Sequence, residues 1–132
     1  MNPNTQQNTG EHLLLIRGTH WNSGLSPAEL QCVMTDFYAW VEGLQSKGIL
    51  RGAQPLVEEG RLVTGAHGLV TDGVFAESKE AIAGYFLLAV ASTDEAVKLA
   101  QACPILAHGA QIEVRPVADM CRPMADVTTM AD

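Results

Sequence analysis

The chain has 132 residues, a length that suits a single domain. Hydrophobic residues make up 47% of it and charged residues 17%, a balance that supports one buried core and excludes a disordered chain. Its formal net charge is −7 and it has no cluster of Lys or Arg, so neither nucleic acid nor an anionic membrane is an expected partner.

The N-terminal part of the chain predicts an arm followed by a buried strand. Residues 1–10 are polar and lack the basic and apolar regions of a secretion signal, so we expect a flexible arm there. Residues 12–17 form the apolar run HLLLIR between Gly10 and Gly18, which is typical of a buried strand.

A long helix is predicted next, with signals at both of its ends. Ser26 suits the N-cap, Pro27 suits the first helical position, and Glu29 completes a capping box with Ser26. Apolar residues then recur three and four positions apart along one stripe: Leu30, Val33, Phe37, Val41 and Leu44. Gly48 suits a left-handed cap, so the pattern predicts a helix from Pro27 to about Lys47.

Short strands and turns are predicted in the middle of the chain. Residues 49–54 and 61–64 are expected to be strands joined by a turn at residues 58–60, and residues 65–68 are loop-like.

The next segment leads towards the centre of the predicted sheet. Residues 69–71 run into the turn dipeptide Asp72-Gly73, where Gly73 would supply a positive φ. A single helical turn is expected over residues 77–82, and residues 85–91 are the best candidate for a central strand.

The last part of the domain repeats the helix-then-strand pattern. A second capping box at residues 92–95 opens a helix that ends at Pro104. Residues 112–117 alternate apolar and polar side chains, as a half-exposed strand does. Residues 119–132 show no clear period and are expected to be a C-terminal tail, which leaves residues 11–118 as the domain.

This order of elements predicts an α+β fold of the ferredoxin-like βαββαβ kind, with an antiparallel sheet and an extra central hairpin. Two helices on one face of a sheet leave the other apolar face uncovered. We therefore expect a second copy of the chain to cover that face, sheet against sheet, as a homodimer or higher homo-oligomer.

Four segments together resemble the YCII-related (DGPF-type) family: LLLIRG at 13–18, LSPAEL at 25–30, FYAWVEGLQSKGILRGAQPL at 37–56, and VTDGVFAESKEAIAGYFLLAVASTDEAVKLAQACP at 70–104. The last of these is the most specific, and the resemblance covers about residues 11–117. Where the family has Asp-Gly-Pro-Phe, this chain has Val74 in place of the proline, which loosens the local turn.

The resemblance implies a dimeric α+β barrel, in which two protomers pack their sheets together and enclose a pocket in each. Proteins of that group include enzymes without a cofactor, and some family members are encoded beside sigma factors of the extracytoplasmic-function class. Some members carry a His–Asp pair with the histidine on the first helix. Residues 27–47 contain no histidine, so that pair is not carried over.

Three residues are candidates for acid–base catalysis. His20 follows the first strand, and a histidine there can transfer protons near neutral pH. His67 precedes the signature segment, and its loop could approach His20 or Asp72. In the competing interpretation both histidines are exposed loop residues and Asp72 only stabilises a turn.

Five further residues are candidates for ligand binding, and each has a structural alternative. Arg17 would bind a carboxylate, or pair with Glu113 across strands. The others are Trp21, Phe75, Glu77 and Lys79. The two aromatic residues would otherwise cover the core, Glu77 would cap a helical turn, and Lys79 would be a solvated charge.

Cysteine and histidine spacing suggests neither a metal site nor a disulfide framework. Cys32, Cys103 and Cys121 form no CxxC pair, and the four histidines have no HxxxH or HxH spacing. No nucleotide-binding motif is present, so no cofactor is expected, and a cytoplasmic location is expected.

Three functions remain open at this stage. The first is binding of a small molecule in a pocket at a homodimer sheet interface. The second is a cofactor-independent enzyme that acts on a small aromatic or carboxylated molecule. The third is a regulatory accessory protein linked to sigma factors of the extracytoplasmic-function class. Fold alone does not decide among them.

Overall fold

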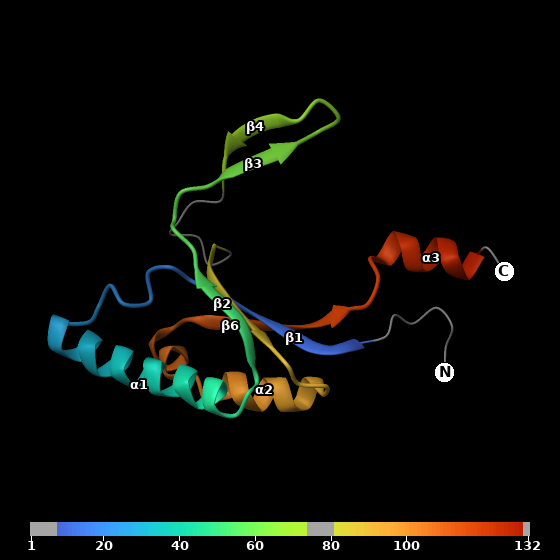
Figure 1. The fold of residues 1–132 in the computed structure, drawn as a ribbon. Helices are drawn as coiled ribbons and strands as arrows, with labels where there is room; N and C mark the ends of the chain where they lie inside the picture. The colour runs from blue at the N-terminus through green and yellow to red at the C-terminus, as the bar shows by residue number, and fades with distance from the viewer. Residues whose placement is uncertain (1–7, 74–80, 131–132) are drawn as a thin grey trace.

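The computed structural model describes residues 8–73 and 81–130, and it is an α+β fold with both main helices on one face of a four-stranded sheet (Figure 1). The sheet is formed by β1 (Asn8–Arg17), β2 (Leu50–Pro55), β5 (Ile82–Leu88) and β6 (Gln111–Ala118). Its strand order is β2-β5-β1-β6 and every neighbouring pair is antiparallel. This is the ferredoxin-like arrangement that the sequence predicted.

Helix α1 (Pro27–Ser46) is formed as its local signals predicted. The Ser26 side chain accepts a hydrogen bond from the Glu29 N–H, and the Glu29 carboxylate accepts one from the Ser26 N–H, each at 3.2 Å. Gly48 has a φ of 72°, which is the left-handed conformation expected just after the helix.

The second helical region has two parts. Helix α2 (Thr93–Gln101) begins at the N-cap Ser92, whose side chain accepts a hydrogen bond from the Glu95 N–H at 3.3 Å. Pro104 follows this helix and also begins the short 3-10 helix η1 (Pro104–His108). The Trp40 indole donates to the Leu99 carbonyl at 3.0 Å and so ties α1 to α2.

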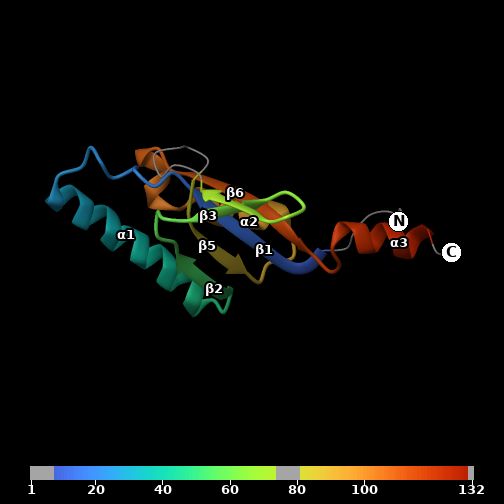
Figure 2. The ribbon, with the colours of Figure 1, turned by 90° about the horizontal axis from the view of Figure 1, so that it is seen from above.

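The extra hairpin is present, and its position in the chain differs from the expected one. Strands β3 (Arg61–Thr64) and β4 (Leu69–Asp72) pair only with each other, through the turn at residues 65–68. The turn expected at residues 58–60 is therefore a linker between two sheets, because β2 pairs with β5. Figures 1 and 2 show the hairpin standing over the sheet face opposite the helices.

Several predicted boundaries were wrong. β1 begins at Asn8 inside the expected arm, and β5 spans Ile82–Leu88 and not residues 85–91. The helical turn predicted over 77–82 falls mainly outside the described residues, and Ile82 belongs to β5. Residues 122–130, expected to lack regular structure, form helix α3 (Arg122–Met130).

Gly73 does not have the positive φ that the turn prediction required. Its N–H instead donates to the Gly60 carbonyl at 3.1 Å, which closes the base of the hairpin. A Cβ at Gly73 would lie 3.2 Å from the Gly60 carbonyl carbon, a tight contact, so glycine favours the close approach of the two backbones here.

The core lies between the helices and one face of the sheet. Its centre consists of alternate residues of the two central strands, Leu14 and Ile16 from β1 and Phe86 and Leu88 from β5. The opposite face of these strands carries Leu13, Leu15, Tyr85 and Leu87, which are half-buried and have no helix over them (Figure 2).

Candidate functional site

An aromatic pocket lies between α1 and the β1–β5–β2 part of the sheet. Its volume is about 320 Å³. It is lined by residues of the β1–α1 loop, α1, three strands and η1: Ile16, Trp21, Met34, Phe37, Tyr38, Val41, Ala53, Gln54, Pro55, Ala83, Gly84, Tyr85, Phe86 and Ile105. Pockets of roughly 300 Å³ and more hold small organic ligands.

Edge-to-face aromatic contacts hold two of the rings that line this aromatic pocket, Phe37 and Phe86, with Trp40 packed behind them. The Phe86 ring lies 6.0 Å from that of Phe37 and 5.2 Å from that of Trp40, both in edge-to-face contact. Such contacts fix the rings more firmly than aliphatic packing does. The pocket therefore has a preformed wall of edges and faces, suited to a flat molecule.

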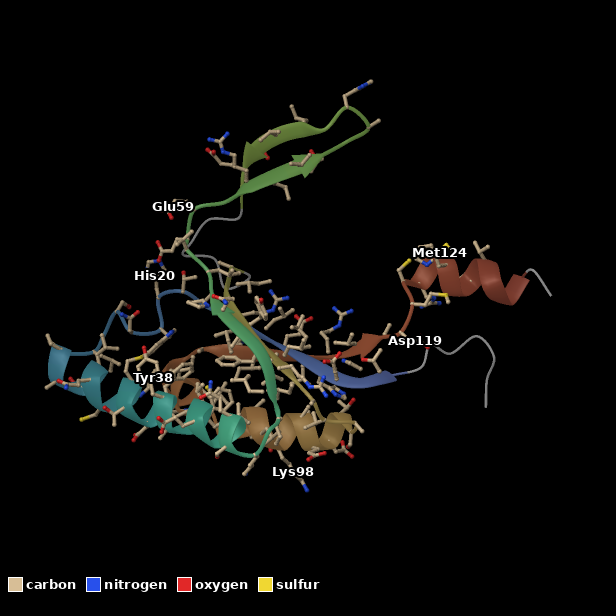
Figure 3. The ribbon with its side chains drawn as sticks, in the orientation of Figure 1. His20, Tyr38, Glu59, Lys98, Asp119 and Met124 are labelled. Carbon is tan, nitrogen blue, oxygen red and sulfur yellow. The ribbon has the colours of Figure 1, made fainter. Side chains whose placement is uncertain are left out.

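The pocket stays open because α1 does not press its whole apolar stripe onto the sheet. Of the residues along the helix, only Leu44 is buried, at the end nearest β2. Val33, Phe37 and Val41 pack against the core but keep part of their surface exposed. Tyr38 is 61% exposed on the same helix and stands at the pocket's rim (Figure 3).

A close approach of two strands shapes the pocket floor. A Cβ at Gly84 would lie 2.8 Å from the Gln54 carbonyl oxygen and 3.2 Å from Pro55 Cα. Only glycine allows β5 and β2 to lie this close here. Gly84 thus has a packing reason in this chain.

None of the described residues that line the aromatic pocket carries a charge. The site therefore offers an apolar ligand a mainly apolar surface, and the only acid–base groups among these lining side chains are the phenols of Tyr38 and Tyr85. A larger hollow of about 580 Å³ runs along the outer surface of α1 only, and a single helix is its wall.

The predicted acid–base residues lie at different places. His20 lies in the loop after β1, His67 in the turn at the tip of the hairpin, and Asp72 at the hairpin's base opposite Arg61. Among the described residues, no hydrogen bond or ion pair joins His20 to His67 or to Asp72. All three are exposed.

His20 has a neighbour that sequence reasoning missed. Its Nε2 lies 3.5 Å from Glu58 Oε1, and both side chains are about half exposed. Glu58 also lines a second hollow of about 310 Å³ at the base of the hairpin, with Thr19, Glu59 and Ile82 among its walls. Figure 3 shows His20 and Glu59 on the two segments that meet there.

Arg17 takes the structural alternative that the sequence offered. Its Nε and Nη2 both donate to Glu113 Oε1, at 3.0 and 2.5 Å, and Arg115 donates to Oε2 at 3.3 Å. These two arginines, Arg17 first, hold the pKa of Glu113 below its ordinary value. The cluster lies on the open sheet face.

Of the other ligand-binding candidates, Trp21 lines the aromatic pocket. Phe75, Glu77 and Lys79 lie outside the described residues. Sequence reasoning missed Met34, Tyr38 and Gln54, which line the pocket from positions far apart in the chain. The apolar stripe of α1 was the one available signal, and it was assigned to the core.

Within residues 8–73 and 81–130, no group of three His, Cys, Asp or Glu side chains is placed to hold a metal ion. No helix in those ranges combines the length and the apolar character needed to cross a membrane. Burial raises the pKa of the Cys103 thiol, which favours its protonated form.

Comparison with protein families gives one match, the YCII-related domain, over residues 17–121. The matched region runs from the last residue of β1 through the hairpin to the residue before α3, so it contains all the residues that line the aromatic pocket except Ile16. A comparison with curated proteins found no match to the chain.

Proposed function

This chain belongs to the YCII-related family, and on that premise we propose that it binds a small, flat, largely apolar molecule in the aromatic pocket. The observation that carries the proposal is the lining of this pocket, with Trp21, Phe37 and Phe86 among its walls and no charged side chain. Burial of apolar ligand surface supplies the affinity, at about 25 cal/mol per Å².

Tryptophan fluorescence tests this proposal, because Trp21 lies in the pocket wall. We expect a neutral bicyclic probe such as 2-naphthol to change the emission saturably. Trp21→Phe should remove most of the change while Trp40→Phe leaves a saturable signal.

A matched pair of variants locates the probe. Ala53→Leu adds bulk inside the pocket and should weaken probe binding at least about tenfold, whereas Ala39→Leu adds the same bulk on the outer side of α1 and should not. Equal affinity in the two variants would show that the probe binds elsewhere.

We propose further that the open sheet face packs on a second copy of the chain. Four half-buried apolar side chains of β1 and β5 lie on this face with charged residues at its margin, which is the usual composition of an interface core and rim. Light scattering at micromolar concentration should give a dimer, and Leu15→Lys should shift it to monomer.

A second candidate function is acid–base catalysis at His20, and the proximity of Glu58 favours it. A carboxylate beside a histidine can orient the imidazole for proton transfer. Substitution of His20 and His67 by glutamine separates the two functions. Unchanged probe affinity fits a binding site in the aromatic pocket, and a large loss would rule out this version of the binding proposal.

A further inference from the structure

The open face of the central strand β1 carries opposite charges at its two ends, so the strand is complementary to an antiparallel copy of itself. His12, Leu14 and Ile16 point into the helix layer, so the alternate residues Glu11, Leu13, Leu15 and Arg17 lie on the open face. Read from either end, this row has a charge, two leucines and the opposite charge. A two-fold axis perpendicular to the strand would place Glu11 against the partner's Arg17 and leucine against leucine.

The two projecting parts of the protomer lie at opposite ends of this row. Arg17 pairs with Ile82, the first residue of β5, so the hairpin between β2 and β5 leaves the sheet at this end. Asn8 pairs with Ala118, the last residue of β6, so α3 follows at the other end. Figures 1 and 2 show the hairpin and α3 separated along the sheet, away from α1 and α2.

Both projecting parts expose apolar side chains. On the hairpin, four residues are 49% to 65% exposed: Leu62, Val63, Leu69 and Val70. Alternation along each strand puts two of them on each face of the hairpin. On and before α3, Met120, Met124 and Val127 are 40% to 57% exposed and recur at the four- and three-residue spacing of one helix face.

A hairpin of two strands is marginally stable in water, and packing on another element stabilises it. Within the described chain, β3 and β4 pack extensively only with each other. The protomer therefore exposes two apolar surfaces, on the hairpin and on α3, which lie apart in this structure (Figures 1 and 2).

We propose that a two-fold axis perpendicular to β1 relates two copies of this chain, and that each hairpin packs on the partner's α3. The inference rests on the proposed homodimer and goes further, because it fixes the direction of the axis and assigns both projections to the interface. The same axis that pairs opposite charges along β1 carries the hairpin end of one protomer over the α3 end of its partner.

A double-mutant cycle on the dimer dissociation constant tests this pairing. The hairpin variant is Val63→Ser with Val70→Ser, and the α3 variant is Met124→Ser with Val127→Ser. Each should raise the dissociation constant at least about tenfold in sedimentation experiments, and the combined variant should add at most about threefold more, since either loss removes the same contact. If the effects of the two variants on the free energy of dissociation simply add in the combined variant, the proposed contact between the hairpin and the partner's α3 is wrong.

Further measurements separate the outcomes. Gln45→Ser with Gln101→Ser, on exposed positions of α1 and α2, is the matched control and should leave the dissociation constant unchanged. Far-UV circular dichroism checks that each variant keeps its fold. A monomeric parent chain would overturn the inference and the homodimer together, while dissociation by Leu15→Lys alone would retain the homodimer and reject the hairpin contact. Probe binding in the aromatic pocket tests neither the homodimer nor the hairpin contact.

Discussion

His12 is the most deeply held polar side chain of the described core. It is fully buried on β1, its Nδ1 donates to the Val90 carbonyl at 2.8 Å, and its Nε2 lies 2.9 Å from the Thr93 hydroxyl. Both ring nitrogens are thus satisfied, and the ring connects β1 to the start of α2. This arrangement explains a histidine that the sequence left without a role.

Truncation of His12 should therefore be costly. His12→Ala leaves the Val90 carbonyl without its donor and opens a cavity, so we expect a loss of about 2–4 kcal/mol in urea unfolding. Thr93→Val, which removes one hydrogen bond at nearly constant volume, should cost only about 1 kcal/mol. An equal effect of the two variants would contradict a central role for His12.

Gly84 offers a second test at the level of one residue. Because a Cβ there would lie 2.8 Å from the Gln54 carbonyl oxygen, Gly84→Ala must push β5 and β2 apart. We expect a loss of about 1–3 kcal/mol in the free energy of unfolding. Gly52→Ala is the control within the same sheet, since its Cβ would meet nothing within 4 Å. Its effect should stay below that of Gly84→Ala.

The ion cluster between β1 and β6 belongs to the scale of paired elements. Arg17 and then Arg115 lower the pKa of Glu113 from its ordinary value of 4.5. The folded state therefore binds the proton of this carboxyl group less readily than the unfolded chain does. Its contribution to stability is present above the ordinary pKa and is lost as the pH falls through the lower pKa of the folded state.

Glu113→Gln should reveal this dependence. The variant should unfold at a lower urea concentration than the parent chain at pH 7, and the difference should shrink as the pH falls below about 4. Glu42→Gln removes an exposed carboxylate from α1 and serves as the control for net charge. A constant gap between parent and Glu113→Gln across this range would contradict the proposed linkage.

The elements differ in how far sequence predicted them. Helix α1 was predicted within one residue because its signals, Ser26, Glu29 and Gly48, are local. The pairing of β2 with β5 was not predicted, because the hydrogen bonds between these strands join segments about thirty residues apart in the chain. Helix α3 was missed because its nine residues include few apolar ones, too few to show a helical period in the sequence.

At the scale of the whole molecule, stability should be uneven. The sheet and its two helices share one core, whereas β3 and β4 pack extensively only with each other within the described protomer. Hydrogen exchange reports such differences in local opening. If a second copy covers the hairpin, its protection must depend on protein concentration.

We therefore expect amides of residues 61–72 to exchange faster on dilution below the dimer dissociation constant, while those of β1 and β5 change far less. Mass spectrometry at two concentrations measures both regions in one sample. Equal hairpin protection at both concentrations would contradict burial by a partner.

By itself, the sequence determined what local chemistry encodes: the two capped helices, the apolar strands of the core, the ferredoxin-like order of elements and the family. It also supplied Trp21 as a ligand-binding candidate and Glu113 as the partner of Arg17. These follow from residue spacing, cap chemistry and motif, which need no knowledge of distant segments.

Only the tertiary structure decided where the candidate site lies. Trp21, Phe37, Ala53 and Phe86 come from four separate segments, and they form one pocket only after β5 enters the sheet between β1 and β2. It also separated His20 from His67 and placed Glu58 beside His20 instead. Proximity between distant residues arises from packing of the whole chain, so no local pattern specifies it.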